Sequence, residues 1–264
     1  MPIRLVMTDV DGTLLRSDGT LSLENARELQ RIRQKGIQVV LATGRIPEML
    51  KDLLDMLGHD VYLICANGAL VIDPSGKVLI DKVLEHKISI SVVEELTHRQ
   101  IYFHAYVRDG RILIDPRFNH PGARKIPEAI YIEDALGFMR DQRLGIRKIT
   151  GWAPHEVVYQ VREWVRRTWG DAVNVWLGGR ESVDVVPSGC SKAVGAREVL
   201  RRLGVDFREV MSIGDAENDL ELLSLVGYPV AMGNASDSVK EISCYVTSSN
   251  DEDGVAKALK HLIP

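Results

Sequence analysis

The segment IRLVMTDVDGTL at residues 3–14 joins a short apolar run to two aspartates and a glycine. The apolar run at 3–8 predicts a buried β-strand, and Asp9 and Asp11 follow at its carboxyl end. In open α/β sheets, ligands bind outside the carboxyl ends of the strands, which is where these carboxylates would lie. Two carboxylates at one site can act as an ionised nucleophile and an acid/base group. Taken alone, the segment also fits a turn with solvated acids, because Asp and Gly are common turn formers.

Short apolar runs alternate with helical stretches through the first and last thirds of the chain. After the first strand, the pattern predicts helices at 22–35 and 46–57 and strands at 37–42 and 61–65. The last third continues the alternation, with predicted helices at 191–203, 217–226, 236–242 and 254–263 and predicted strands at 209–213, 228–232 and 244–248. The alternation predicts a parallel sheet with helices on both faces, and the fully apolar strands favour it.

The middle of the chain has a different pattern. Predicted strands at 101–107 and 111–115 are joined by Asp109-Gly110, a strong hairpin signal. Further strands are predicted near 146–151, 173–178 and 182–186, around a helix at 155–168. We therefore predict an α/β fold in which a Rossmann-like, doubly wound parallel sheet core carries an inserted α+β domain. The predicted boundaries are 1–83 plus 187–264 for the core and 84–186 for the insertion.

Two further polar clusters suit the binding of a phosphate group. In LATGR at 41–45, Thr43 offers a hydroxyl, Gly44 an approachable backbone amide, and Arg45 a charge for a second anionic group. In PSGCSKAVGA at 187–196, Lys192 opens a predicted helix, whose positive end also favours an anion. The plainer alternatives are a helix N-cap threonine with a turn glycine, and an ordinary surface lysine.

The fourth cluster, GDAENDLELL at 214–223, follows the predicted strand 209–213. Asp215, Asn218 and Asp219 offer oxygen ligands of the kind that Mg²⁺ prefers. The cluster also fits an acidic helix N-terminus favoured by the helix dipole. Taken separately, the plain alternatives explain each cluster, but they do not explain why all four clusters follow the ends of predicted strands. Three acids at one site repel each other, and a Mg²⁺ among them removes that repulsion and polarises a phosphoryl oxygen.

Together and in this order, the four clusters closely resemble the haloacid dehalogenase superfamily. The resemblance extends to CANGAL at 65–70, VDVVPSGCSK at 183–192, VAMGNAS at 230–236 and TSSNDEDGVAKAL at 247–259. These segments look like the Cof-type branch, in which a type IIB cap is inserted between the second and third motifs. The resemblance covers nearly all of both core segments, whereas residues 84–186 match a cap only by size and position.

The resemblance implies a role for each matching residue. Asp9 would be the nucleophile and a Mg²⁺ ligand, Asp11 the general acid/base with its backbone carbonyl on the metal, and Asp215 the third protein ligand. Asp219 would support the metal or the lysine, and Arg45 is a further supporting residue. The phosphate would be held by the backbone of Val10 and by Thr43, Gly44, Lys192 and Asn218.

Two positions depart from the family's usual pattern. Thr8 stands where relatives usually carry an aromatic or apolar residue, and Ala193 stands where glycine commonly follows the lysine. Neither departure removes a functional group.

Composition limits the partners and the compartment. The net charge of −4, from 33 basic and 37 acidic residues among 264, argues against nucleic acid as the main partner. Three scattered cysteines (Cys65, Cys190 and Cys244) are not a disulfide framework and fit a reducing cytosol. The N-terminus lacks the apolar length of a signal peptide, and no apolar run of about 18 residues suggests a membrane span. We expect a cytoplasmic enzyme, with an oligomeric state of monomer or dimer left open.

The predicted function is a Mg²⁺-dependent phosphatase that acts on a small-molecule phosphate ester, such as a sugar phosphate, through an aspartyl-phosphate. A phosphomutase of the same superfamily would use the same motifs, and a non-catalytic phospho-ligand sensor is the third alternative. Release of free phosphate separates the first from the other two. In the insertion, the candidates for reading the leaving group are His104, Tyr106, Arg117, His120 and Arg180.

Overall fold

A computed structural model describes residues 2–121, 126, 129–178 and 181–264. The chain divides into two compact units, Met1–Ile80 with Ser191–Pro264 and Asp81–Cys190. We call the first the core unit and the second the inserted unit. The roles predicted for them, hydrolase core and cap, and the predicted boundaries at 84 and 186 stay predictions.

The core unit is built on a sheet in which, among the described residues, eight strands follow the order β14-β13-β12-β1-β2-β3-β4-β5. From β14 to β3, every neighbouring pair is parallel, and β4 runs antiparallel to β3. The strands are β1 (Leu5–Thr8), β2 (Gln38–Ala42), β3 (Tyr62–Cys65), β4 (Leu70–Ile72), β5 (Val78–Asp81), β12 (Val210–Gly214), β13 (Tyr228–Ala231) and β14 (Tyr245–Val246).

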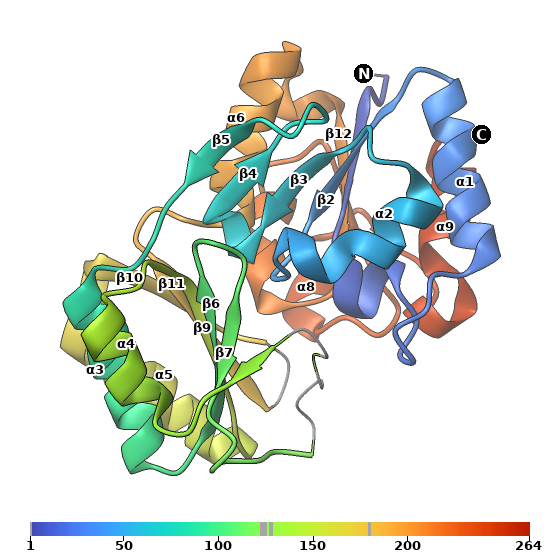
Figure 1. The fold of residues 1–264 in the computed structure, drawn as a ribbon. Coiled ribbons are helices and arrows are strands. Elements are labelled where there is room, and N and C mark those ends of the chain that lie inside the picture. The colour runs from blue at the N-terminus through green and yellow to red at the C-terminus, as the bar shows by residue number, and fades with distance from the viewer. Residues whose placement is uncertain (1, 122–125, 127–128, 179–180) are drawn as a thin grey trace. The chain divides into compact units, whose positions relative to one another are not determined.

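Helices cover both faces of this sheet (Figure 1). They are α1 (Leu23–Gln34), α2 (Lys51–Leu57), α6 (Lys192–Leu203), α7 (Leu220–Leu223), α8 (Asp237–Ile242) and α9 (Gly254–Leu262). Short single turns complete the unit: η1 (Val10–Leu14), η2 (Pro47–Leu50), η3 (Ala66–Gly68), η5 (Phe207–Glu209), η6 (Glu217–Asp219) and η7 (Asn250–Glu252).

Successive residues of β1 point to opposite faces, as the pleat of a strand requires. Val6 joins one apolar cluster with side chains of α1, α2 and α9, whereas Leu5 and Met7 join another with side chains of α6. All four residues of β1 are fully buried, as expected for a central parallel strand. The predicted doubly wound parallel sheet is therefore confirmed.

The inserted unit has a second sheet, with the order β10-β11-β9-β6-β7-β8 in the described part of the chain. Its neighbouring strands run antiparallel, except that β7 and β8 are parallel. The strands are β6 (Tyr102–Val107), β7 (Ile112–Ile114), β8 (Ile130–Tyr131), β9 (Ile146–Trp152), β10 (Val173–Leu177) and β11 (Ser182–Pro187). The helices are α3 (His86–His98), α4 (Ala135–Gln142) and α5 (His155–Trp169), followed by the turn η4 (Gly170–Ala172).

The helices α3, α4 and α5 share one apolar cluster with alternate residues of the strands of the inserted unit. Phe103 and Ala105 of β6 face this cluster, and His104 between them belongs to the opposite face. The hairpin predicted at Asp109-Gly110 is confirmed, because β6 and β7 pair antiparallel and Gly110 has a φ of 91°. Together these features confirm the predicted α+β character.

Some predicted elements are shorter in the structure. The helix predicted at 217–226 is a single turn, η6, followed by α7, which ends at Leu223. The chain then turns at Gly227, whose backbone amide donates to the carbonyl of Phe207. A Cβ on Gly227 would lie 2.2 Å from the carbonyl oxygen of Arg208, so there is no room for a side chain. The strand predicted at 244–248 pairs only as Tyr245–Val246.

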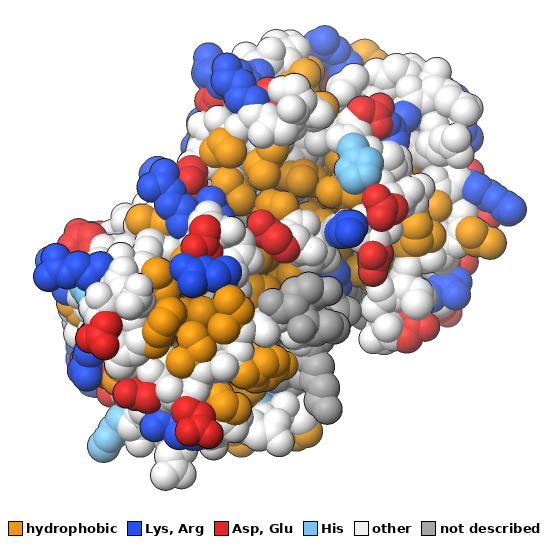
Figure 2. All heavy atoms as spheres, viewed as in Figure 1, with side chains coloured by type: hydrophobic (Ala, Val, Ile, Leu, Met, Phe, Trp, Pro, Cys, Tyr) orange, Lys and Arg blue, Asp and Glu red, His pale blue; other side chains and the backbone are white. Residues whose placement is uncertain are grey.

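On the face of the molecule drawn in Figure 2, acidic and basic side chains are interspersed with hydrophobic ones. This pattern agrees with the nearly balanced charge of the chain. Among the helices of the described residues, none has the length and apolar character needed to cross a membrane.

Candidate active site

Two neighbouring inner strands of the core sheet, β1 and β12, bring Asp9 and Asp215 together. β1 and β12 are parallel neighbours in the register Thr8 to Ile213, and the amide of Asp9 donates to the carbonyl of Ile213 at 3.0 Å. Asp9 follows the last residue of β1, and Asp215 follows the last residue of β12. Two residues 206 positions apart along the chain (215 minus 9) therefore meet at one edge of the sheet, as the strand-end argument predicts.

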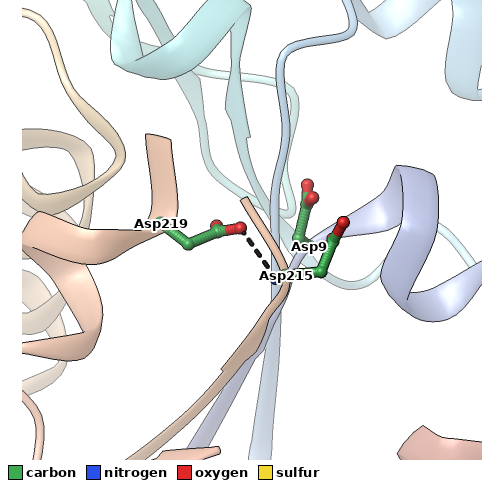
Figure 3. Close-up of side chains that lie close together, drawn as sticks. All are labelled: Asp9, Asp215 and Asp219. Atoms are coloured by element: carbon green, nitrogen blue, oxygen red, sulfur yellow. Dashed lines mark hydrogen bonds between the residues drawn. The ribbon is translucent and has the colours of Figure 1, made fainter. Parts of the chain in front are cut away.

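Asp219 completes a group of three carboxylates. One oxygen from each of Asp9, Asp215 and Asp219 lies within 4.8 Å of the others. Figure 3 shows the three side chains close together at the end of the strands. Asp219 belongs to the turn η6, and its carboxylate accepts hydrogen bonds from the backbone amides of Asp215 and Ala216, both at 3.2 Å. These bonds fix the turn against the end of β12.

Burial and mutual repulsion disfavour the ionised forms of these acids. Burial is the main cause that raises the pKa of Asp9 well above its ordinary value, and the charges of Asp219 and Asp215 raise it further. Burial, and then the charge of Asp219, raise the pKa of Asp215 to about 7. Oxygen donors crowded in this way suit a hard cation such as Mg²⁺, which would offset their repulsion. The residues present therefore fit the predicted metal.

The side chain of Lys192 brings a positive charge to the three acids. Its side chain is fully buried, and its Nζ lies 2.8 Å from Asp9 Oδ1 and 2.7 Å from Asp219 Oδ1. Burial alone would lower the pKa of Lys192, but the two carboxylates outweigh it and raise the pKa above its ordinary value. Lys192 opens α6, whose N-cap residue Ser191 accepts from the amide of Val194 at 3.1 Å. The surface-lysine alternative is wrong.

The turn after Asp9 has features that only particular residues allow. Gly12 has a φ of 74°, and a Cβ on it would lie 2.5 Å from Asp215 Oδ2. Only glycine therefore permits the chain to pass so close to Asp215. The next residue, Thr13, donates from Oγ1 to Asp215 Oδ1 at 2.7 Å. Sequence reasoning assigned Thr13 no role, although it lies inside the motif DVDGTL.

The carboxylate of Asp11 pairs with Arg45. Arg45 donates from Nε to Asp11 Oδ2 at 2.8 Å and from Nη2 to Oδ1 at 2.5 Å. The guanidinium is nearly buried, with 9% of the side chain exposed, whereas 56% of the Asp11 side chain is exposed. Asp11 is thus held by a two-pronged pair and still open to solvent. The second anionic group predicted for Arg45 stays a prediction.

The remaining predicted phosphate ligands lie in adjacent turns. Thr43 is buried at the end of β2, and its Oγ1 accepts from the amide of Arg45 at 3.1 Å. Gly44 lies between these two residues, and Val10 lies buried in η1. Asn218, in η6, donates from Nδ2 to Asn67 Oδ1 at 2.9 Å. Asn67 is a second residue that sequence reasoning left without a role, although it lies in the quoted segment CANGAL.

The candidates in the inserted unit differ in how they are held. His104 is fully buried, and its Nε2 lies 2.8 Å from the hydroxyl of Tyr102, while Tyr106 lies beside it. Burial and the charge of Lys148 lower the pKa of His104 to about 3, so its ring is neutral at physiological pH. Arg117 pairs with Asp115 at 2.6 Å. Arg180 lies outside the described residues, and the leaving-group roles stay predictions.

The comparisons with known proteins identify the family. The family described as haloacid dehalogenase-like hydrolase matches residues 6–259. The chain belongs to the haloacid dehalogenase-like hydrolases. It is therefore an enzyme, a phosphatase of that superfamily, as the sequence predicted.

Two curated relatives and one solved structure illustrate the similarity. A 5-amino-6-(5-phospho-D-ribitylamino)uracil phosphatase, YcsE of Bacillus subtilis, is 31% identical and aligns over 99% of this chain and 96% of its own. An HMP-PP phosphatase of Serratia proteamaculans is 28% identical over 98% of this chain and 94% of its own. A haloacid dehalogenase-like hydrolase from B. subtilis has 25% identity and a TM-score of 0.86, covering 99% of this chain and all of the other (100%).

Proposed function

We propose that this chain is a Mg²⁺-dependent phosphatase that hydrolyses a small phosphorylated metabolite through a phosphoryl group carried on Asp9. The observation that carries the proposal is the group of Asp9, Asp215 and Asp219, in which one oxygen of each lies within 4.8 Å of the others. Asp9 and Asp219 are buried and pair with the buried ammonium of Lys192, and Asp215 is half-buried. Several acids this close together and shielded from water destabilise the fold unless they bind a charged ligand. A divalent cation and a phosphoryl group are the ligands that the arrangement suits.

The reaction has two displacement steps. Asp9 attacks phosphorus, the bond from phosphorus to the ester oxygen breaks, and Asp11 gives its proton to the departing oxygen. A water molecule then attacks the phosphoryl group on Asp9, Asp11 takes the proton from that water, and phosphate and free Asp9 are formed. Splitting one difficult displacement into two is the advantage of a covalent intermediate.

Charge stabilisation is the larger part of the catalytic task. Proton transfer contributes typically about 10²–10⁴-fold, while uncatalysed monoester hydrolysis is among the slowest reactions known. The rest must come from positive groups aimed at the phosphoryl oxygens. Lys192 supplies one such charge, and further donors are the backbone of Val10 together with Thr43, Gly44 and Asn218.

The metal would be held by the carboxylates of Asp9 and Asp215 and by the backbone carbonyl of Asp11. When bound, Mg²⁺ supplies positive charge that neutralises the acids and polarises a phosphoryl oxygen. Asp219 takes a supporting role, because its carboxylate already accepts from Lys192 and from two backbone amides. Thr13 orients the Asp215 carboxylate through the bond to Oδ1.

The substrate class is the finer part of the proposal. One relative is named for a phosphate on a ribitylamino-uracil, and another is named for HMP-PP. We extend to this chain the class that such names share, small phosphorylated metabolites. We also propose that the inserted unit acts as the cap that reads the leaving group, and that the enzyme is cytoplasmic.

The test is hydrolysis of p-nitrophenyl phosphate, with and without Mg²⁺, by wild type and by Asp9→Asn. We expect Mg²⁺-dependent release of free phosphate by wild type and a loss of at least 10³-fold in Asp9→Asn, because the nucleophile is removed. Asp206→Asn is the matched control, since Asp206 is an exposed acid of the core unit paired with Arg208. Activity of Asp9→Asn within tenfold of the control would refute the assignment.

A panel of phosphorylated metabolites, ranked by kcat/KM, then identifies the substrate. Ranking is needed because a promiscuous enzyme turns over many esters slowly. Release of inorganic phosphate without a bisphosphate activator marks a phosphatase. Transfer of the phosphoryl group to a second sugar hydroxyl would instead mark a phosphomutase.

A further inference from the structure

The turn η3 (Ala66–Gly68) has an uncommon backbone. Ala66, Asn67 and Gly68 have φ values of 48°, 52° and 88°, so three consecutive residues lie in the left-handed region. Residues other than glycine rarely adopt this backbone region, and Asn tolerates it better than most residues. Such a conformation persists only where the surrounding structure fixes it, and clusters of it often mark functional sites.

The surroundings of the turn are the segments that carry the predicted phosphate ligands. The amide of Ala66 donates to the carbonyl of Arg45 at 2.8 Å, and the amide of Asn67 donates to the carbonyl of Thr43 at 3.0 Å. A Cβ on Gly68 would overlap the carbonyl oxygen of Ser191, the N-cap residue of the helix that begins with Lys192. The turn is therefore packed between the Thr43 segment and the start of α6.

The side chain of Asn67 contacts a further segment with a predicted phosphate ligand, the turn η6 that carries Asn218. Asn67 is fully buried, and its Oδ1 accepts from Asn218 Nδ2 at 2.9 Å. A carboxamide NH₂ has two hydrogens. The bond to Asn67 uses one hydrogen of Asn218 and leaves the second for another acceptor. One side chain thus ties η6 to the turn that already holds the Thr43 segment.

We propose that Asn67 is a positioning residue for phosphate recognition: it orients the Asn218 carboxamide so that its second N–H faces the phosphoryl group. The inference rests on the phosphate-binding role proposed above for Asn218. Asn67 acts through Asn218 and makes no contact with the substrate itself. A purely structural role, in which Asn67 only suits the left-handed turn, predicts different kinetics.

The experiment is a double-mutant cycle with Asn67→Gly, Asn218→Ala and the combined variant. Glycine keeps the left-handed conformation, so it removes the side chain without imposing strain on the turn. The readouts are the inhibition constant of inorganic phosphate, and KM and kcat for p-nitrophenyl phosphate. Melting curves fix an assay temperature at which all the variants are folded.

If Asn67 acts through Asn218, Asn67→Gly weakens phosphate inhibition roughly 2–12-fold in the wild-type background, the usual value of one hydrogen bond. In the Asn218→Ala background, the same change has less than a twofold effect, because the group it positions is absent. The effect lies mainly in KM and in phosphate inhibition, whereas a general loosening of the fold lowers kcat in both backgrounds.

Asn25→Ala is the matched control. Asn25 is a fully buried amide of the core unit that bonds the carbonyl of Leu14 at 3.1 Å and the amide of Ala256 at 2.9 Å. Its effect should multiply with that of Asn218→Ala. If the effects of Asn67→Gly and Asn218→Ala also multiply, the inference is wrong and the proposed function stands. If Asn218→Ala leaves phosphate inhibition unchanged, the phosphate role of Asn218 fails, and the inference fails with it.

Discussion

Replacing Lys192 by methionine tests the electrostatic arrangement of the site. The change keeps most of the side-chain length and removes the ammonium, whose Nζ lies 2.8 Å from Asp9 and 2.7 Å from Asp219. Removing one partner of a buried ion pair typically costs about 3–5 kcal/mol, because the other charge stays buried and unpaired. Without Mg²⁺ at pH 7.5, we expect a loss of stability of this size.

The assay is scanning calorimetry with EDTA and again with Mg²⁺. A loss of 3–5 kcal/mol corresponds to a fall of roughly 6–20 °C in the melting temperature for a protein of this size. Mg²⁺ should recover part of the fall, because the cation replaces the lost positive charge among the acids. We also expect kcat/KM to fall by about 10²–10³-fold, the usual effect of removing one group that stabilises the transition state.

Lys148→Met is the matched control for this experiment. Lys148 is a buried lysine of the inserted unit, with 6% of its side chain exposed and Asp184 as its carboxylate partner at 3.2 Å. Its replacement should lower the melting temperature relative to wild type by the same amount in EDTA and in Mg²⁺, because the metal site is intact. The reasoning would be refuted if Lys192→Met melted within 2 °C of wild type in EDTA, a limit well inside the fall expected above, or if its melting temperature lay as far below that of wild type in Mg²⁺ as in EDTA.

Three further predictions follow from the contacts of the site. Thr13→Val removes the donor to Asp215 Oδ1, so the Mg²⁺ concentration for half-maximal rate should rise roughly 2–12-fold with kcat nearly unchanged; a Mg²⁺ titration of initial rates measures both. Because the pKa of Asp215 is raised to about 7, the folded state binds more protons than the unfolded state between about pH 4 and 7. Stability in EDTA should therefore fall as the pH rises through 7. Calorimetry in EDTA should show a lower melting temperature at pH 8 than at pH 5.5. Adding Mg²⁺ should raise the melting temperature more at pH 8 than at pH 5.5. Arg45→Gln removes the two-pronged contact that holds the Asp11 carboxylate. It should lower kcat/KM more for an alkyl phosphate than for p-nitrophenyl phosphate, because a poor leaving group depends more on the proton that Asp11 gives. Equal losses for the two substrates would contradict this.

The sequence predicted the core sheet well because its signals are local. The apolar residues of β1 and β2 are buried on both faces, which a single strand reveals through its composition. The general rule that ligands bind outside the carboxyl ends of strands then placed the acids that follow two of these strands at one site, and the structure adds that β1 and β12 are parallel neighbours. The meeting of Asp9 with Asp215 could therefore be anticipated although no local pattern links these residues.

Other features depend on contacts that a single chain segment does not reveal. α3 and α4 of the inserted unit were not predicted, since their apolar faces are defined only by packing against the second sheet. The pair between Arg45 and Asp11 and the bond between Asn67 and Asn218 join residues 34 and 151 positions apart. Such long-range polar pairs produce no periodic pattern in the sequence. The left-handed turn at Asn67 also produces no such pattern, so it was not predicted.

The covalent role of Asp9 is tested most directly by trapping its phosphoryl group. Asp11→Asn should slow the second step, so the intermediate accumulates during turnover of p-nitrophenyl phosphate in Mg²⁺. Acid quenching and borohydride reduction convert an aspartyl-phosphate to homoserine, which peptide mass spectrometry locates. We predict homoserine at position 9, dependent on substrate. Its absence from Asp9 during turnover, or its appearance at another aspartate, would contradict the account.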